Sequence, residues 1–498
     1  MRELLFAAAL WLNTGGAASA PSQVHLAADP ADVAAIEDLG KQVSAKTCSA
    51  DLDVNEAIAK RIDESSAQDD VKSRTGLIVA LCAIYEGNLD AAYRYVSRAS
   101  KYDAAINQVW LLKFGLELQR ATYDDAVTSL IKIMQQRPIL FQNLQPGWIY
   151  QLSRDLKTSK LESSREKLDR ALLDGNFAPV GEVAPLDPFH RDYAEILATR
   201  GDMKAARAQL GSLVAPFSIA YASLAPATRP LYAADPDVRA AALHCLDIAR
   251  QAMVANPDRL NPAIEAAQVL RLLGRFQEAV QLMQPYKARL ERGDKFVDQD
   301  RANWWWDGLG AGLAGLGDYT MMVDAYRRGA ALDEGGSLNV SQVINQADMQ
   351  VALNHPADAL ETLKAFDDPK RQGNRYGDMQ MRTVRGCARF LVGDKVGAAE
   401  DLAYVDSHEK DAPNGAVELH LCRGEQDAAA AVAIRWLHAD AGPVTALSTL
   451  STYASPPAAL AKDPMHLGED KLAQRPDVKA AIDRFGGIRT FNILPSSF

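Results

Sequence analysis

Residues 107–138 read NQVWLLKFGLELQRATYDDAVTSLIKIMQQRP, and this stretch decides the fold. Apolar side chains such as Trp110 and Leu116 recur at the spacing of one buried helix face, and Leu130 continues that pattern after a short polar turn. Pro138 ends the second apolar run, because proline lacks a backbone N–H and clashes with the preceding helical turn. The stretch therefore predicts two short antiparallel helices.

Similar stretches recur before and after this one. Ala126, which is expected where the two helices cross, has a counterpart at Ala92, and 126 − 92 is 34 residues. A hairpin of this size cannot bury its apolar faces alone, so neighbouring copies must stack on it. Further turns, each followed within five residues by a crossing residue, lie at 274–276, 317–319, 354–356, 393–395 and 424–426.

Signature positions within these copies resemble those of the tetratricopeptide repeat superfamily. Trp110, Tyr123, Ala126 and Pro138 stand at that family's spacing, and the copy at 306–329 fits nearly as well. The resemblance covers about three quarters of the chain. It implies an all-α, right-handed superhelical solenoid whose first helices line a concave groove that binds a peptide or protein.

Composition narrows the classes of partner. The chain has 498 residues, 48% of them hydrophobic and 24% charged, with a net charge of −10. A sequence-independent nucleic-acid binder needs a basic face, so we expect no nucleic-acid partner. No stretch after the first residues reaches the roughly 18 apolar residues of a membrane span.

The first 20 residues, MRELLFAAALWLNTGGAASA, resemble a secretory signal peptide. An unbroken apolar run over 4–12 is followed by the small residues Ala18, Ser19 and Ala20, which form a cleavage site. The alternative is that this run is the first helix of the solenoid. The signal-peptide interpretation predicts a periplasmic or secreted bacterial protein without a membrane span after cleavage.

The repeat pattern also predicts the domain organisation. A linker at 21–30 precedes two solenoid segments, at 31–255 and 256–486, and a C-terminal tail follows at 487–498. The boundaries rest on an internal echo between LYAADPDVRAAALHCL at 231–246 and KLAQRPDVKAAIDRF at 471–485. We interpret both as closing helices that cover the last hairpin of a block.

Motifs that could carry chemistry lack the context that they require. Residues 310–315 match G-x-G-x-x-G but lie inside a predicted helix after Trp304, Trp305 and Trp306, whereas a dinucleotide site needs a preceding strand. Small residues there let neighbouring helices approach closely. The histidines show no metal-binding spacing. Because the chain shows no catalytic constellation either, we predict no catalytic residues, no metal and no cofactor.

The tryptophan cluster offers the clearest candidate for a binding surface. In the repeat frame Trp304 falls on the groove face, with Asp307 and Ala311 one and two turns further on. An exposed tryptophan there would anchor a partner, and the alternative is that all three tryptophans pack between superhelical turns. The other predicted groove positions are Gln108, Leu111, Gln119, Ser341, Ile344 and Asp348.

Four of the five cysteines are spaced as pairs. Cys48 and Cys82 are 34 residues apart, and Cys387 and Cys422 are 35 apart, which is about one repeat. Each pair is therefore expected on first helices of adjacent hairpins, close enough for a disulfide in an oxidising compartment. The alternative is that they are small, buried, reduced residues, as we expect for Cys245.

The sequence therefore predicts an exported scaffold, and not an enzyme, that binds a protein or peptide through a concave helical groove. Two other functions stay open. One is a peptidoglycan-cleaving enzyme built on a helical solenoid, and the other is a soluble accessory protein for polysaccharide export.

Overall fold

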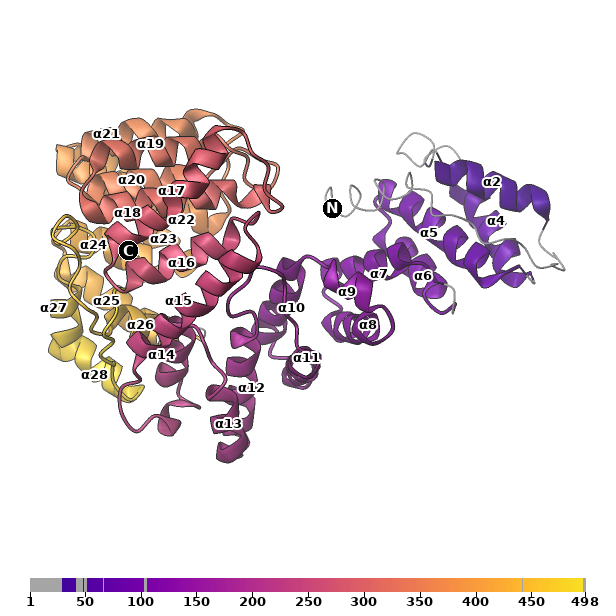
Figure 1. Cartoon of the computed structure of the whole chain (residues 1–498), viewed down its shortest axis with the longest axis horizontal. Helices are drawn as coiled ribbons and strands as arrows, with labels where there is room; N and C mark the ends of the chain where they lie inside the picture. The colour runs from indigo at the N-terminus through magenta and orange to yellow at the C-terminus, as the bar shows by residue number, and fades with distance from the viewer. Residues whose placement is uncertain are drawn as a thin grey trace. The chain divides into compact units, whose positions relative to one another are not determined.

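The computed structural model describes residues 29–41, 48, 52–65, 67–102, 105–440 and 442–495 (Figure 1). Helices make up 71% of the structure. The described ranges contain no strand, and they contain two isolated β-bridges, which pair Glu334 with Ser337 and Thr452 with Thr490. The predicted all-α helical solenoid is confirmed. The predicted signal peptide, residues 1–20, and nearly all of the linker at 21–30 lie outside the described residues.

The chain divides into two compact units, Met1–Gly175 and Asn176–Phe498. We call them the N-terminal and C-terminal units. The sequence pattern placed a boundary at 255/256, but these positions lie inside the C-terminal unit. There α15 (Val238–Ala255) packs against α16 (Asn261–Leu272), and Ala249 and Ala266 belong to one core. The apolar face of α15 is thus continued by the next repeat and does not close a block.

The N-terminal unit stacks helix hairpins in chain order. Its central hairpin pairs α7 with α8 as predicted, with Trp110 and Leu130 buried and Ala126 fully enclosed where the helices cross. Pro138 does not lie in α8 but begins a short helix of its own. The helices are α2 (Pro30–Lys41), α4 (Leu52–Glu64), α5 (Asp69–Tyr85), α6 (Leu89–Ala99), α7 (Asn107–Gln119), α8 (Tyr123–Gln136), α9 (Pro138–Gln142), α10 (Pro146–Thr158) and α11 (Glu162–Asp174).

The C-terminal unit continues the hairpin pattern. Its first helices α16, α18, α20, α22 and α24 lie next to one another in that order. The remaining helices are α12 (Asp187–Thr199), α13 (Met203–Leu210), α14 (Pro216–Leu224), α17 (Phe276–Glu291), α18 (Ala302–Leu316), α19 (Tyr319–Ala330), α20 (Ser341–Ala352), α21 (Pro356–Leu363), α22 (Arg375–Val392), α23 (Lys395–Ser407), α24 (Pro413–Cys422), α25 (Gln426–Leu437), α26 (Pro443–Leu450), α27 (Glu469–Gln474) and α28 (Pro476–Arg484), with 3-10 turns at 229–231, 299–301, 364–367 and 409–411.

The glycines of α18 explain the G-x-G-x-x-G match. A Cβ atom on Gly310 would lie 2.7 Å from the ring of Tyr326, and one on Gly315 would overlap the ring of Phe276. The motif therefore permits close packing against α19 and α17, as the sequence interpretation held, and it lies in the middle of a helix.

The C-terminal residues return to the beginning of their own unit. Helix α26 packs against α14, and the backbone N–H of Leu494 donates to the carbonyl of Leu272 at the end of α16. Residues 452–454 run beside 489–493 and exchange backbone hydrogen bonds with them. The expected tail, residues 487–498, is thus packed over 487–495 and is not free (Figure 1). We call residues 452–468 the strap.

Candidate functional site

A row of polar side chains crosses the first helices of the C-terminal unit. We call it the polar row, and its members are Arg271 on α16, Asp307 on α18, Asn345 and Asp348 on α20, Tyr376 on α22 and Glu418 on α24. Tyr376 is 55% exposed and the other members are half-buried. Because each helix adjoins the next, the row runs from repeat to repeat.

One end of the polar row is held by hydrogen bonds between neighbouring helices. Asn345 donates from Nδ2 to Oδ1 of Asp307 over 2.7 Å, and Arg271 donates to the backbone carbonyl of Gly308 over 3.0 Å. Burial raises the pKa of Asp307, although the bond from Asn345 and the charge of Arg271 oppose that shift. Burial also lowers the pKa of Arg271. Each charge at this end is therefore partly desolvated beside an opposite charge.

Carboxylates gather at the other end of the row. Asp348 and Glu418 face Asp463 and Glu469, which come from the strap and the start of α27, and we call these four the acidic cluster. Burial, followed by the charge of Asp463, raises the pKa of Asp348 to about 8. Burial raises the pKa of Glu469 to about 7 and also raises that of Glu418. The surroundings of the cluster therefore disfavour the ionised forms of these three carboxyl groups.

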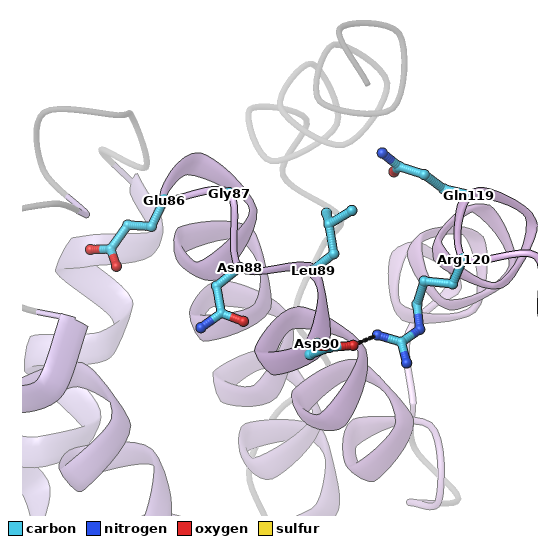
Figure 2. Close-up of a pocket in the computed structure, with 7 residues that line it drawn as sticks. All are labelled: Glu86, Gly87, Asn88, Leu89, Asp90, Gln119 and Arg120. Atoms are coloured by element: carbon cyan, nitrogen blue, oxygen red, sulfur yellow. Dashed lines mark hydrogen bonds and ion pairs between the residues drawn. The ribbon is translucent and has the colours of Figure 1, made fainter.

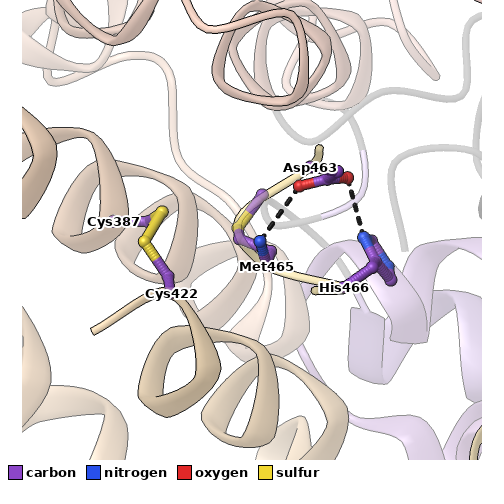
Figure 3. The surroundings of a disulfide bond; sticks show 5 residues. All are labelled: Cys387, Cys422, Asp463, Met465 and His466. Carbon is purple, nitrogen blue, oxygen red and sulfur yellow. Dashed lines mark hydrogen bonds and ion pairs between the residues drawn. A yellow bond between two sulfur atoms is a disulfide. The ribbon is translucent and has the colours of Figure 1, made fainter. Parts of the chain in front are cut away.

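His466 is the cation within the acidic cluster. Its Nδ1 lies 2.8 Å from Oδ2 of Asp463, whose other oxygen accepts the backbone N–H of Met465 (Figure 3). Burial disfavours its protonation, but the hydrogen bond and charge of Asp463, followed by the charges of Glu469 and Glu418, raise its pKa well above the ordinary value. In turn, the charge of His466 lowers the pKa values of Asp348, Glu418 and Glu469.

A disulfide lies next to this site. Cys387 of α22 and Cys422 of α24 are bonded, with Cα atoms 5.8 Å apart, and the buried side chain of Met465 lies beside them (Figure 3). In the N-terminal unit Cys48 and Cys82 are also bonded, with Cα atoms 4.9 Å apart. Both pairs are those that the repeat spacing indicated, and their oxidation in the native compartment stays a prediction.

Cys245 is the cysteine outside these pairs. It is free and buried, as expected from the sequence. Burial raises the pKa of its thiol to about 12, which keeps the thiol protonated and unreactive.

The three tryptophans differ in burial. The sequence offered two interpretations, an accessible Trp304 on the groove face or three packed tryptophans. Trp305 and Trp306 are buried, with their rings edge to face at 5.0 Å, and they pack inside the unit. Trp304 is half-buried, and so are Asp307 and Ala311. Trp304 therefore keeps part of its ring accessible on the same helix as a member of the polar row.

The predicted positions on α20 need one correction. Ser341 and Asp348 are half-buried, but Ile344 is only 6% exposed and belongs to the hydrophobic core. The apolar side chain of Ile344 packs into the core. The adjacent Asn345 occupies the position on the polar face that was predicted for Ile344, and it donates a hydrogen bond to Asp307.

The predicted groove positions of the N-terminal unit differ in exposure. Gln108 and Leu111 are half-buried, and Gln119 is exposed. Gln119 lines a hollow of about 610 Å³ between two hairpin turns, where Arg120 forms an ion pair with Asp90 (Figure 2). The guanidinium of Arg120 also covers the ring of Tyr93 at 4.7 Å, so it is already engaged. The rest of the lining is Glu86, Gly87, Asn88 and Leu89.

Two kinds of feature are absent from the described ranges. No group of three or more histidine, cysteine, aspartate or glutamate side chains there is arranged to hold a metal ion. No helix within the same ranges is long and apolar enough to cross a membrane.

Sequence reasoning missed Glu418, Asp463, His466 and Glu469. Glu418 stands on a first helix in the repeat frame, so its position could have been read from the pattern. The strap residues carry no repeat signal, because they lie in a Pro-rich interval without helical periodicity. Their approach to α20 and α24 becomes visible only in the folded unit.

Comparisons with known proteins give only distant similarity. No protein-family profile and no curated protein sequence matches the chain. A tetratricopeptide repeat protein from Parabacteroides merdae aligns at 12% identity and a TM-score of 0.31, covering 68% of this chain and 93% of that one. A structure of Naa15/Naa10 bound to HypK-THB aligns at 16% identity and a TM-score of 0.27, covering 84% and 67%. The chain's own stacked helix hairpins are those of a helical repeat protein.

Proposed function

We propose that this chain is an exported scaffold whose C-terminal unit binds a positively charged segment of another protein along the polar row. The observation that carries the proposal is the acidic cluster. Four carboxyl groups, from α20, α24, the strap and α27, converge, and burial raises the pKa of Asp348, Glu418 and Glu469. A lysine or arginine side chain would supply the opposite charge that such desolvated carboxylates require.

Aromatic side chains on the helices that carry the row suit an extended peptide. Trp304 and Tyr376 offer partly accessible aromatic rings, which can lie against the aliphatic stem or the charged head of a basic side chain. If Trp304 is an anchor, Trp304→Ala should weaken binding by about 2 kcal/mol.

Binding of a defined peptide tests this proposal. A short fluorescent peptide of alternating arginine and glycine is titrated against the chain without residues 1–20, and the anisotropy is followed. The double variant Asp348→Asn, Glu418→Gln should bind at least about tenfold more weakly, because two charge-assisted contacts are lost. The matched control Asp247→Asn, Glu400→Gln removes the same charge from exposed positions and should bind as the parent does. Equal affinity of the two double variants would contradict the proposal.

Export is proposed on two grounds. The first residues resemble a signal peptide, and the two disulfide pairs are of a kind that persists in oxidising compartments. Sequencing of the mature N-terminus from the native host should begin between Ser19 and Ser22, and an intact Met1 would refute export.

A cell-wall hydrolase is the second candidate. Glycosidases use a carboxylic acid with a raised pKa beside an ionised carboxylate, and the acidic cluster holds carboxyl groups with raised pKa values. Release of soluble fragments from purified peptidoglycan, abolished in the Asp348→Asn, Glu418→Gln variant, would establish that activity. The scaffold proposal expects no such release.

A further inference from the structure

The strap lies over the polar row's acidic end and is held at separate points. Near its beginning, Thr452 donates to the carbonyl of Arg489 and accepts the N–H of Phe491. Further on, Leu460 is buried against Phe276 and Ala352, at the turn ends of two hairpins. At its far end His466 enters the acidic cluster.

The strap is shallow along much of its length. Its buried side chains are Leu460, Asp463 and Met465, whereas Leu467, directly after His466, is 61% exposed. Lifting residues 455–468 would uncover two buried apolar side chains, Leu460 and Met465, and would break no helix of the repeats, whereas Tyr453 stays packed against Phe491 at the strap's beginning. This part of the strap can therefore leave its place at a low cost in buried apolar surface.

His466 occupies the place that the proposed function gives to a partner's basic side chain. The titratable groups that face it are Asp463 and Glu469 from its own segment and Glu418 from α24, and Asp348 of α20 lies close enough to feel its charge. Each of these four is a carboxylate, and the imidazolium is the cation that they share. A basic side chain from a partner would need the same oxygens.

We propose that the strap is an autoinhibitory element in which His466 acts as a built-in cation that competes with the partner's basic segment for the acidic cluster. The inference rests on the proposed function. His466 must leave Asp463 before a lysine or arginine of the partner can bind there. The rest of the polar row stays accessible throughout.

The acid–base properties of the site agree with this arrangement. The pKa of His466 lies well above its ordinary value, so the imidazolium persists in neutral solution. As pH rises through that value the imidazolium loses its charge, and the competing contact weakens. A guanidinium, which stays protonated, would then displace it more readily.

The deciding experiment compares His466→Gln with the parent chain, using the arginine–glycine peptide. Glutamine removes the charge but can still donate a hydrogen bond to Asp463. At about pH 7, where a pKa of about 7 leaves Glu469 about half ionised in the parent and the imidazolium of His466 persists, we expect the variant to bind the peptide about tenfold more tightly, the effect of removing one competing charged contact. The difference should shrink as the pH rises and the parent's imidazolium is lost. Equal or weaker binding by His466→Gln would overturn the inference.

A second measurement does not depend on substituting His466. Amide hydrogen exchange across residues 452–468 of the parent chain should become faster when the peptide is added, whereas unchanged or slower exchange would contradict strap release. Leu460→Ala, which weakens the strap's apolar anchor and keeps His466, should also bind the peptide more tightly.

The two proposals fail in different ways. If the parent chain binds the peptide through Asp348 and Glu418 but His466→Gln gains nothing, autoinhibition alone is refuted. If neither the parent nor His466→Gln binds it, the proposed function and the inference fall together.

Discussion

The backbone N–H of Leu494 donates to the carbonyl of Leu272 over 2.8 Å, although 222 residues (494 − 272) separate the two. The bond joins the last described segment of the C-terminal unit to the C-terminal end of α16, which belongs to the first half of that unit. The pairing of α14 with α26 makes the same connection. In an open solenoid each repeat contacts only its neighbours, so this unit gains cooperativity from contacts between its ends.

Arg489 contributes to that closure through several hydrogen bonds. Its side chain is 9% exposed, and the guanidinium donates to the carbonyls of Ser223 and Tyr232 and to Asp235. Arg489→Ala should lower the free energy of unfolding of the C-terminal unit by about 2–3 kcal/mol, since Asp235 loses a charged partner and two carbonyls lose donors. Urea unfolding followed by circular dichroism measures this. Lys471→Ala, at an exposed position in α27, is the control and should leave stability unchanged.

Close packing of α18 against α19 gives a second prediction. Gly310→Ala forces a methyl group against the ring of Tyr326, and we expect a loss of about 1–3 kcal/mol. Gly377→Ala in the first turn of α22 is the matched control, because its new Cβ would meet neighbours at an ordinary 3.6 Å. It should be neutral or slightly stabilising in the same unfolding assay. A tolerated Gly310→Ala would contradict the packing account.

The disulfides can be tested by mapping peptides from protein taken out of its native compartment. Non-reducing digests should contain Cys48 linked to Cys82 and Cys387 linked to Cys422, with Cys245 as the one free thiol. The double variant Cys387→Ser, Cys422→Ser should be destabilised by about 2–4 kcal/mol, because the unfolded chain is no longer constrained. Five free thiols in that material would rule out both bonds and weaken the case for export.

The acidic cluster makes the stability of the C-terminal unit depend on pH. The pKa of Asp348 is about 8 in the folded chain, above the value of about 3.9 for an unfolded aspartate. A raised folded pKa favours folding at low pH, and that contribution is lost as pH rises through about 4 to 8. Asp348→Asn removes this loss, so it should gain at least about 1 kcal/mol relative to the parent between about pH 5 and pH 8. A difference that does not change with pH would show that Asp348 titrates normally.

The local part of the structure follows from the sequence. Trp110 and Ala126 lie within one hairpin, and helical periodicity together with the length of the repeat places both of them. Ile344 shows the limit of that frame, because an error of one residue along a helix turns a side chain by about 100°, from core to surface. Asn345 was therefore missed although its neighbour was named.

Contacts between distant segments could not be predicted in this way. Asp348 and His466 are 118 residues apart (466 − 348), and Arg489 and Asp235 are 254 apart (489 − 235). Periodicity describes how each helix buries its own face, but it does not say which loop returns to which repeat. The acidic cluster and the strap are products of that return, so they appear only in the folded chain.

Site-specific crosslinking in the native host tests the central claim most directly. A photo-crosslinking residue replaces Tyr376, which is 55% exposed beside Asp348 and Glu418, and in a control chain it replaces Val254, which is 83% exposed on α15. The captured peptides are then sequenced by mass spectrometry. The account predicts a discrete segment rich in lysine or arginine at position 376 and not at position 254. Capture at position 376 of acidic or neutral segments, or of the same peptides as at position 254, would contradict it.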